Sequence, residues 1–204
     1  QLVTPSLSFQ GSDATGGAFN IRGITNLAVS PTAESGVEIH VNDLPVGATT
    51  MQDGDFLDME RIEVLRGPQG TLYGKNSVGG VINLITAKPQ FGQTFGSMTL
   101  EKGSYDLVKT KMMFNMPIGD SLALRIAGAS NDRDGDIKNI YSKAKTSHVN
   151  NRNSGAYRIS LAWDATDRTD VLFVHENYSE NSMRHYVNNV YCQRDPSFVA
   201  GCTP

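Results

Sequence analysis

Two glutamates three positions apart, Glu60 and Glu63, are residues whose type and spacing could support acid–base chemistry. A pair of carboxylates performs glycoside hydrolysis in many enzymes. Here Arg61 and Arg66 offer salt-bridge partners, the pair spans a predicted helix–strand junction, and the neighbouring residues imply no cleft. We therefore interpret Glu60 and Glu63 as part of a charged cluster, and we predict no catalytic residue and no enzyme.

The run GTLYGKN, residues 70–76, is similar to a phosphate-binding loop. That loop requires a glycine five residues before its Gly-Lys pair and a serine or threonine after it. Gln69 and Asn76 occupy those two positions. Because the pattern fails twice, we predict no nucleotide site and no cofactor.

Three aspartates around Gly135, namely Asp132, Asp134 and Asp136, suggest a calcium loop. Tyr141 stands where such a loop places its bidentate glutamate. The histidines show no ligand spacing among themselves, and they are His40, His148, His175 and His185. We expect a solvated loop and predict no metal site.

Cys192 and Cys202 are the two cysteines, and both lie in the polar C-terminal stretch. A disulfide between them would close a small loop and imply an oxidising compartment. The alternative is two unpaired thiols in a cytosolic protein. Metal binding by two cysteines without an adjacent histidine is less favoured than either.

The composition is that of an ordered chain, with 39% hydrophobic residues and many turn formers, 20 glycines and 8 prolines. A net charge of −3 argues against a nucleic-acid footprint. The sequence contains no apolar run long enough for a transmembrane helix and no visible signal peptide. Neither end resembles a natural terminus, so we expect a piece of a longer protein.

The first half of the chain predicts a small mixed domain of short elements. Residues 62–65 and 81–86 read as strands around a centre that we judge too glycine-rich for a helix or a strand. This favours a hairpin-like connection. Further elements are strands at residues 19–24 and 37–41, a turn at Asn42 and Asp43, a short partner at 44–46, and a helix at 56–61 with Asp55 as N-cap.

After Pro89 the apolar residues alternate with period two over five longer segments, at residues 96–102, 108–116, 121–131, 156–164 and 170–178. Short and long connectors also alternate between them. Alternating strands with this loop asymmetry are typical of an outer-membrane β-barrel, in which the apolar face meets lipid. We expect the even positions of 108–116 to face lipid. An antiparallel sandwich with one solvated face remains the alternative.

The stretch 59–89 closely resembles the plug signature of TonB-dependent outer-membrane receptors. The matching blocks are ERIEVLRGP at 60–68, GTLYG at 70–74 and GGVINLIT at 79–86. Upstream, IRG at 21–23 and VEIHVND at 37–43 also fit the pattern. The resemblance runs through about the first 90 residues, and the period-two strands fit the family's barrel.

This resemblance implies a mixed α/β plug domain at 1–90, followed at 91–204 by the first five or so antiparallel transmembrane strands and their extracellular loops. In the family the complete barrel has about 22 strands. The implied function is TonB-dependent active uptake of a scarce solute, such as a ferric siderophore, across the Gram-negative outer membrane. The implied partners are TonB, energised by ExbB–ExbD, outer-membrane lipid and a small-molecule ligand, with the receptor a monomer. The TonB box that TonB binds would precede this chain.

A ligand-sensing receptor of the same family is one alternative function, and a soluble β-rich extracellular enzyme is another. The resemblance further implies that Arg22 and Arg66, with Glu60 and Glu63 beside them, form a plug–barrel lock with glutamates beyond this chain. Local pairing of Arg66 with Glu60, Glu63 or Asp58 is the alternative. Cys192 and Cys202 would form a disulfide in an outward loop. The implied ligand-binding loops are 26–35 and 47–53, the latter with Gly47, Ala48, Thr49, Thr50, Met51 and Gln52.

Overall fold

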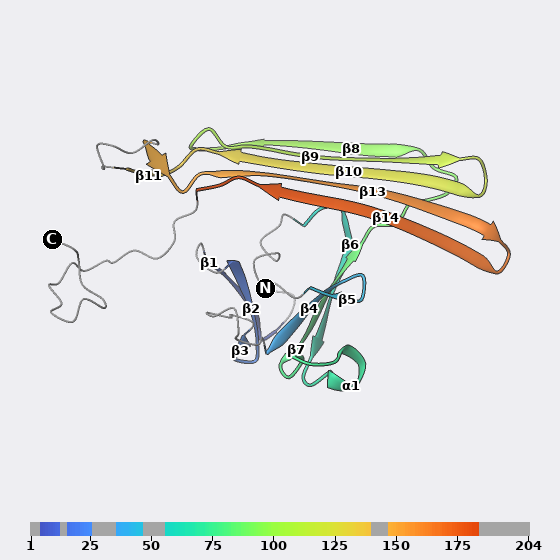
Figure 1. The fold of residues 1–204 in the computed structure, drawn as a ribbon, viewed down its shortest axis with the longest axis horizontal. Coiled ribbons are helices and arrows are strands. Elements are labelled where there is room, and N and C mark those ends of the chain that lie inside the picture. The colour runs from blue at the N-terminus through green and yellow to red at the C-terminus, as the bar shows by residue number, and fades with distance from the viewer. Residues whose placement is uncertain (1–4, 13–15, 26–35, 47–55, 140–146, 184–204) are drawn as a thin grey trace, which may run out of the picture.

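A long five-stranded sheet lies over two smaller sheets from the first half of the chain (Figure 1). The computed structural model describes residues 5–12, 16–25, 36–46, 56–139 and 147–183. Within these ranges no helix has the length and apolar character needed to cross a bilayer. The predicted ligand loops 26–35 and 47–53, together with Cys192 and Cys202, lie outside the described residues.

The two smaller sheets are built from short strands. One has the order β1-β2-β3 and the other β5-β4-β7-β6, with β4 parallel to β7 and β6 antiparallel to it. Their bounds are β1 Leu7–Ser12, β2 Gly16–Ile21, β3 Ile24–Thr25, β4 Val37–Val41, β5 Leu44–Pro45, β6 Met59–Arg66 and β7 Gly80–Thr86. The predicted strand at 37–41, its turn and short partner, and the hairpin-like pairing around the glycine-rich centre are confirmed.

An aliphatic core joins these two sheets. Val37 and Ile39 of β4 share one face with Ile82 and Leu84 of β7, because side chains two apart in a strand point the same way. Ile21 of β2 closes this core from the neighbouring sheet and is fully buried. Burial of β-branched side chains on a pleated surface therefore holds the first half of the chain together.

The second half forms an antiparallel sheet of the order β14-β13-β10-β9-β8. Its strands are β8 Phe95–Lys102, β9 Val108–Ile118, β10 Leu122–Arg133, β13 Arg152–Thr166 and β14 Thr169–Glu180. All five predicted strands are confirmed. The long connector after β10 also carries a pair of antiparallel strands of two residues each, β11 Ile137–Lys138 and β12 His148–Val149.

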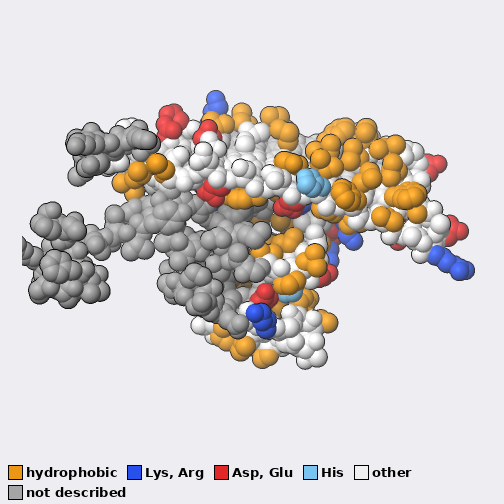
Figure 2. Space-filling model, viewed as in Figure 1, with side chains coloured by type: hydrophobic (Ala, Val, Ile, Leu, Met, Phe, Trp, Pro, Cys, Tyr) orange, Lys and Arg blue, Asp and Glu red, His pale blue; other side chains and the backbone are white. Residues whose placement is uncertain are grey.

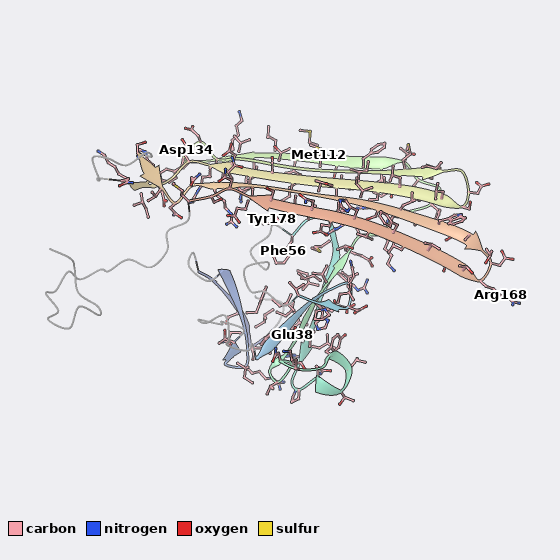
Figure 3. The ribbon with its side chains drawn as sticks, in the orientation of Figure 1. Glu38, Phe56, Met112, Asp134, Arg168 and Tyr178 are labelled. Carbon is pink, nitrogen blue, oxygen red and sulfur yellow. The ribbon has the colours of Figure 1, made fainter. Side chains whose placement is uncertain are left out.

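The two faces of this sheet differ in chemistry. One face carries exposed apolar side chains, and Figure 2 shows them gathered over the sheet. They include Met98, Met112, Phe114, Met116, Ile126, Tyr157, Ile159, Trp163 and Phe173. The opposite face buries small and polar residues, among them Asn115, Ala123, Arg125, Ala127, Arg158 and Ser160. Met112 and Phe56 lie on opposite sides of the sheet (Figure 3).

The predicted helix at 56–61 is wrong. Residues 56–58 precede a strand, and β6 begins at Met59, with a register irregularity between Met59 and Arg61. Pairing with β7 provides this segment with a ladder of backbone hydrogen bonds and packs Val64 on the core. These tertiary contacts outweigh the weak local preference for a helical turn.

Two further predictions need correction. The glycine-rich centre does contain a helix, the single turn α1 Gly70–Tyr73, in which the Gly74 N–H donates to the Gly70 carbonyl. The predicted strand at 19–24 is divided, because Arg22 and Gly23 adopt positive φ angles of 54° and 87°. Such a turn ends β2 at Ile21 and begins β3 at Ile24.

Candidate functional site

The first half of the chain is fixed to the long sheet by a buried ion pair between Asp58 and Arg125. The Arg125 Nε donates to Asp58 Oδ2 at 2.7 Å and its Nη2 to Oδ1 at 2.6 Å. The two side chains are 11% and 7% exposed. A planar guanidinium with two parallel hydrogen bonds to one carboxylate fixes orientation as well as distance. Asp58 has a positive φ of 49°, a conformation that this residue type tolerates better than most.

A second arginine holds the same short segment by its backbone. The Arg158 Nη1 donates to the Leu57 carbonyl at 2.7 Å and approaches the Asp58 carbonyl at 3.3 Å. Its Nε donates to Glu176 Oε2 at 2.8 Å, and only 2% of its side chain is exposed. Arg158 is opposite Ala127, two residues from Arg125, so both guanidiniums lie on one face of the sheet.

The link between the two halves is also fixed to the sheet. Asn115 of β9 is fully buried, accepts the Gln90 N–H, and donates to the Gln90 and Gln93 carbonyls. Phe95, the first residue of β8, lies below the Arg125 guanidinium at 5.6 Å. An amide that accepts one backbone hydrogen bond and donates two is satisfied without water.

A polar network crosses the small sheet. Asn83 of β7 donates to Asp43 Oδ1 at 2.7 Å and to Glu63 Oε2 at 3.3 Å. Asp43 and Asn42 form the β4–β5 turn with φ of 67° and 50°, as a two-residue hairpin loop requires. The network therefore connects the turn, the central strand and β6.

Arg61 lies between the two glutamates first considered for catalysis. Its Nη1 is 2.6 Å from Glu60 Oε1, and its Nε is 2.7 Å from Glu63 Oε1. The hydrogen bond from Arg61 lowers the pKa of Glu63 below its usual range. Both glutamates are thus acceptors in an exposed ion-pair cluster. This agrees with their interpretation from the sequence as part of a charged cluster.

The two arginines of the predicted lock occupy exposed positions. Arg22 and Arg66 are both exposed, and no ion pair of either joins it to another described residue. Asp58, an alternative local partner of Arg66, binds Arg125 instead. The lock role of Arg22, Arg66, Glu60 and Glu63 stays a prediction.

The aspartates considered for calcium do not converge. Asp136 accepts a hydrogen bond from Asn150 and lies 3.9 Å from Arg133, whereas Asp132 is part of β10 opposite Val108. Across the described ranges, no group of three histidine, cysteine, aspartate or glutamate side chains could hold a metal ion.

Comparison with known proteins decides the family. Residues 1–81 match the model of the TonB-dependent receptor plug domain. This part of the chain is therefore a plug domain of the TonB-dependent outer-membrane receptors. The chain is 40% identical over 84 residues to the iron-regulated outer membrane virulence protein of Vibrio cholerae, covering 38% of this chain and 13% of that protein. To the pesticin receptor of Yersinia pestis it is 31% identical over 122 residues, 59% of this chain and 17% of the receptor.

Solved receptors share the fold. The ferric yersiniabactin uptake receptor of Yersinia pestis superposes with a TM-score of 0.76 at 25% identity, covering 89% of this chain and 28% of that receptor. The pyoverdine receptor of Pseudomonas aeruginosa gives 0.67 at 20% identity over 87% of this chain and 24% of that receptor. The chain thus spans under a third of these relatives, as a plug and a fragment of the barrel.

The comparisons identify the parts of the structure. The small sheets belong to the plug, the five-stranded sheet is part of the wall of an outer-membrane barrel, and the family consists of receptors and transporters, not enzymes. The contacts of Asp58 and Leu57 with Arg125 and Arg158 therefore join plug to wall. Alternation places both arginines on the polar strand face, but nothing in the sequence pairs them with residues 57 and 58.

Proposed function

We propose that the full-length protein is a TonB-dependent importer of a ferric chelate across the outer membrane. The supporting observation is the polar attachment of the plug. Arg125 of the wall binds the Asp58 carboxylate, and Arg158 of the wall donates a hydrogen bond to the Leu57 carbonyl. Hydrogen bonds and an ion pair can be exchanged for bonds to water when a plug moves, whereas a continuous apolar interface would oppose its hydration. A plug held in this way can open and reseat.

The names of the relatives support iron as the element carried. One is an iron-regulated outer membrane protein, and another, from Pseudomonas aeruginosa, is a ferric enterobactin receptor. The matched structures include a ferric yersiniabactin uptake receptor. The proposal assigns a related iron chelate to this protein.

In this proposal the chelate binds from outside, against the plug loop 47–53 and the extracellular barrel loops. TonB, energised by ExbB–ExbD, acts through a segment upstream of Gln1, and the receptor works as a monomer. Arg22 and Arg66 are exposed, and we retain them as partners for barrel glutamates beyond Pro204. Cys192 and Cys202 form a disulfide in an outward loop.

Uptake of iron-55 by a deletion strain tests the proposal. The strain should regain accumulation of one or more iron-55 chelates when it carries the full-length gene. That gain should disappear when TonB is deleted or a protonophore is added, because the outer membrane has no energy source of its own. Equal accumulation with and without the gene, across chelates of catecholate, hydroxamate and carboxylate types, would rule the proposal out.

A further inference from the structure

Arg158 connects two wall strands and the plug through one guanidinium. Its Nη1 donates to the Leu57 carbonyl of the plug at 2.7 Å, and its Nε donates to Glu176 Oε2 of β14 at 2.8 Å. Arg158 and Glu176 are directly opposite each other in the register of β13 and β14. The Arg158 side chain is almost fully buried, so its guanidinium depends on these protein partners for its hydrogen bonds.

The bond to Glu176 determines where the rest of the guanidinium points. A guanidinium is planar and its five N–H groups have fixed directions, so a hydrogen bond at Nε restricts the direction of Nη1. The Leu57 carbonyl carries no net charge, and it therefore orients Arg158 less strongly than the Glu176 carboxylate does. Glu176 thus aims Arg158 at the plug backbone.

Glu176 also keeps the two buried arginines on separate acceptors. Arg125 and Arg158 lie on one face of the paired strands β10 and β13, and Arg125 donates both hydrogen bonds that reach the Asp58 carboxylate. Arg158 approaches only the Asp58 backbone carbonyl, at 3.3 Å. Within the described ranges, Glu176 is the carboxylate that pairs with Arg158. Because a buried cation without a carboxylate is costly, an Arg158 that lost Glu176 would compete with Arg125 for Asp58.

Glu176 is placed on a strand that spans the wall from end to end. β14 begins beside the short turn at Arg168 and runs toward the end marked by Asp134, where the long connector after β10 lies (Figure 3). The strand ends at Glu180, four residues after Glu176. A shift of the β14 backbone would therefore reach the plug through two side chains, Glu176 and Arg158.

We propose that Glu176 is a positioning residue for import, which holds Arg158 against the Leu57 carbonyl and so keeps the segment before β6 seated on the wall. The inference rests on the proposed import function and assigns control of plug release to one wall carboxylate. Displacement of Glu176 turns Arg158 toward Asp58, away from the Leu57 carbonyl. Both contacts of the plug with the wall arginines then weaken together.

Hydrogen exchange measured by mass spectrometry on the full-length receptor in detergent tests the role. Glu176→Gln keeps the size of the side chain and an acceptor oxygen but removes the charge. Exchange of residues 56–66 should rise about tenfold, the equivalent of one weakened charge-assisted hydrogen bond, while β9 and β10 exchange as in the wild type. Arg158→Lys keeps the charge without the planar fork, and it should produce the same local increase.

Glu101→Gln is the matched control. Glu101 of β8 is directly opposite Lys109 of β9, so this variant also removes a carboxylate that faces a cation across two wall strands. No hydrogen bond joins Glu101 to a plug residue within the described part of the chain. Exchange of residues 56–66 should stay at the wild-type rate. Equal exchange in Glu101→Gln and Glu176→Gln would overturn the inference.

The exchanged pair, Arg158→Glu with Glu176→Arg, separates positioning from simple strand pairing. It restores an ion pair between β13 and β14 but moves the guanidinium away from the strand that reaches Leu57. The yield of heat-modifiable barrel on gels should match the wild type, while exchange of residues 56–66 stays raised. Wild-type exchange in the exchanged pair would show that Glu176 only joins two strands, and would refute the positioning role.

Iron-55 uptake separates this inference from the proposed function. In Glu176→Gln the maximal rate of uptake should fall severalfold, because the plug reseats less reliably between cycles. The chelate concentration for half-maximal uptake should not change, since Glu176 holds the plug and not the cargo. Uptake at the wild-type maximal rate would refute the positioning role alone. Raised exchange in Glu176→Gln, in a receptor that imports no iron chelate, would refute the cargo and leave the hold on the plug standing.

Discussion

Asp58 and Arg125 are 67 positions apart in the sequence, yet their side chains share two hydrogen bonds of 2.6 and 2.7 Å in a nearly dry environment. One belongs to the plug and the other to the wall. The charges are distributed in the opposite way to the lock expected from the sequence, because here the plug supplies the carboxylate and the wall supplies the arginine. The contact lies directly before β6, since Asp58 immediately precedes Met59.

Asp58→Asn should loosen the plug. Removal of one charge from a buried pair leaves Arg125 uncompensated, at a typical cost of about 3–5 kcal/mol. Protease accessibility of the plug in the full-length receptor should rise, and the urea midpoint of plug unfolding should fall. Arg61→Gln breaks an exposed ion-pair cluster and is the control for which little change is expected. Equal protease sensitivity of the two variants would contradict the anchoring role.

The double variant Asp58→Leu with Arg125→Met separates stability from function. Apolar replacement of both partners often restores stability, because no buried charge remains. We expect the urea midpoint to recover toward the wild-type value while iron uptake stays impaired, since an apolar contact does not exchange readily with water. Uptake that recovers together with stability would indicate that the ion pair only holds the fold.

Met112→Arg should impair assembly of the barrel. Met112 is 53% exposed on the apolar face of β9, where lipid would lie. An arginine near the bilayer midplane costs about 2–4 kcal/mol on a lipid-facing position. The yield of heat-modifiable barrel on gels measures assembly. Met113→Arg, one residue along and on the opposite face, should assemble better, and the reverse order would mean that the faces are exchanged.

Gly80→Ala should destabilise the plug. Gly80 has a φ of 146°, and a Cβ there would collide with the Leu65 carbonyl oxygen of the paired strand β6. Strained backbone at such a position costs about 1–3 kcal/mol before the collision is counted. The urea midpoint of plug unfolding measures the effect. Gly70→Ala meets nothing within 4 Å and should leave the midpoint close to wild type.

The Glu63 carboxyl should titrate below the usual glutamate range, because Arg61 donates a hydrogen bond that favours the charged form. A group whose pKa is lower in the folded state stabilises that state above its unfolded pKa, and the contribution disappears as pH falls through the folded pKa. Carbon-13 NMR of glutamate-labelled receptor measures this titration. Arg61→Gln should move the Glu63 pKa upward, and an unchanged titration would contradict the assignment.

The alternation of residues predicts the wall well. Arg125 and Arg158 fall on the polar face of their strands, and Tyr157, Ile159 and Trp163 fall on the apolar face, because a two-residue period survives in any half-buried sheet. The strand ends differ by a few residues, since pairing with neighbours extends β10 to Arg133 and β13 back to Arg152. Those extensions place Arg133 directly opposite Arg152.

The plug is less predictable because its elements are short. Residues 56–61 follow the predicted cap Asp55 and include charged residues, so local preference indicates a helix, whereas pairing of β6 with β7 makes residues 59–61 part of a strand. The partner of Asp58 could not be read locally, because Arg66 is near in sequence and Arg125 is near only after folding. Long-range contacts between the plug and the wall leave no periodic pattern in the sequence of either part.

Asn115 determines how far a pulling force can travel along the chain. A load applied upstream and passed along the backbone would reach the Asp58–Arg125 contact first. Only after that contact, β6 and β7 had given way would it reach Gln90 and Gln93, which three hydrogen bonds with the Asn115 amide fasten to the wall. We expect the buried amide to act as a second stop, after the Asp58–Arg125 contact. Extension should end there, leaving β8 seated and giving the displaced plug a fixed tether from which it can refold.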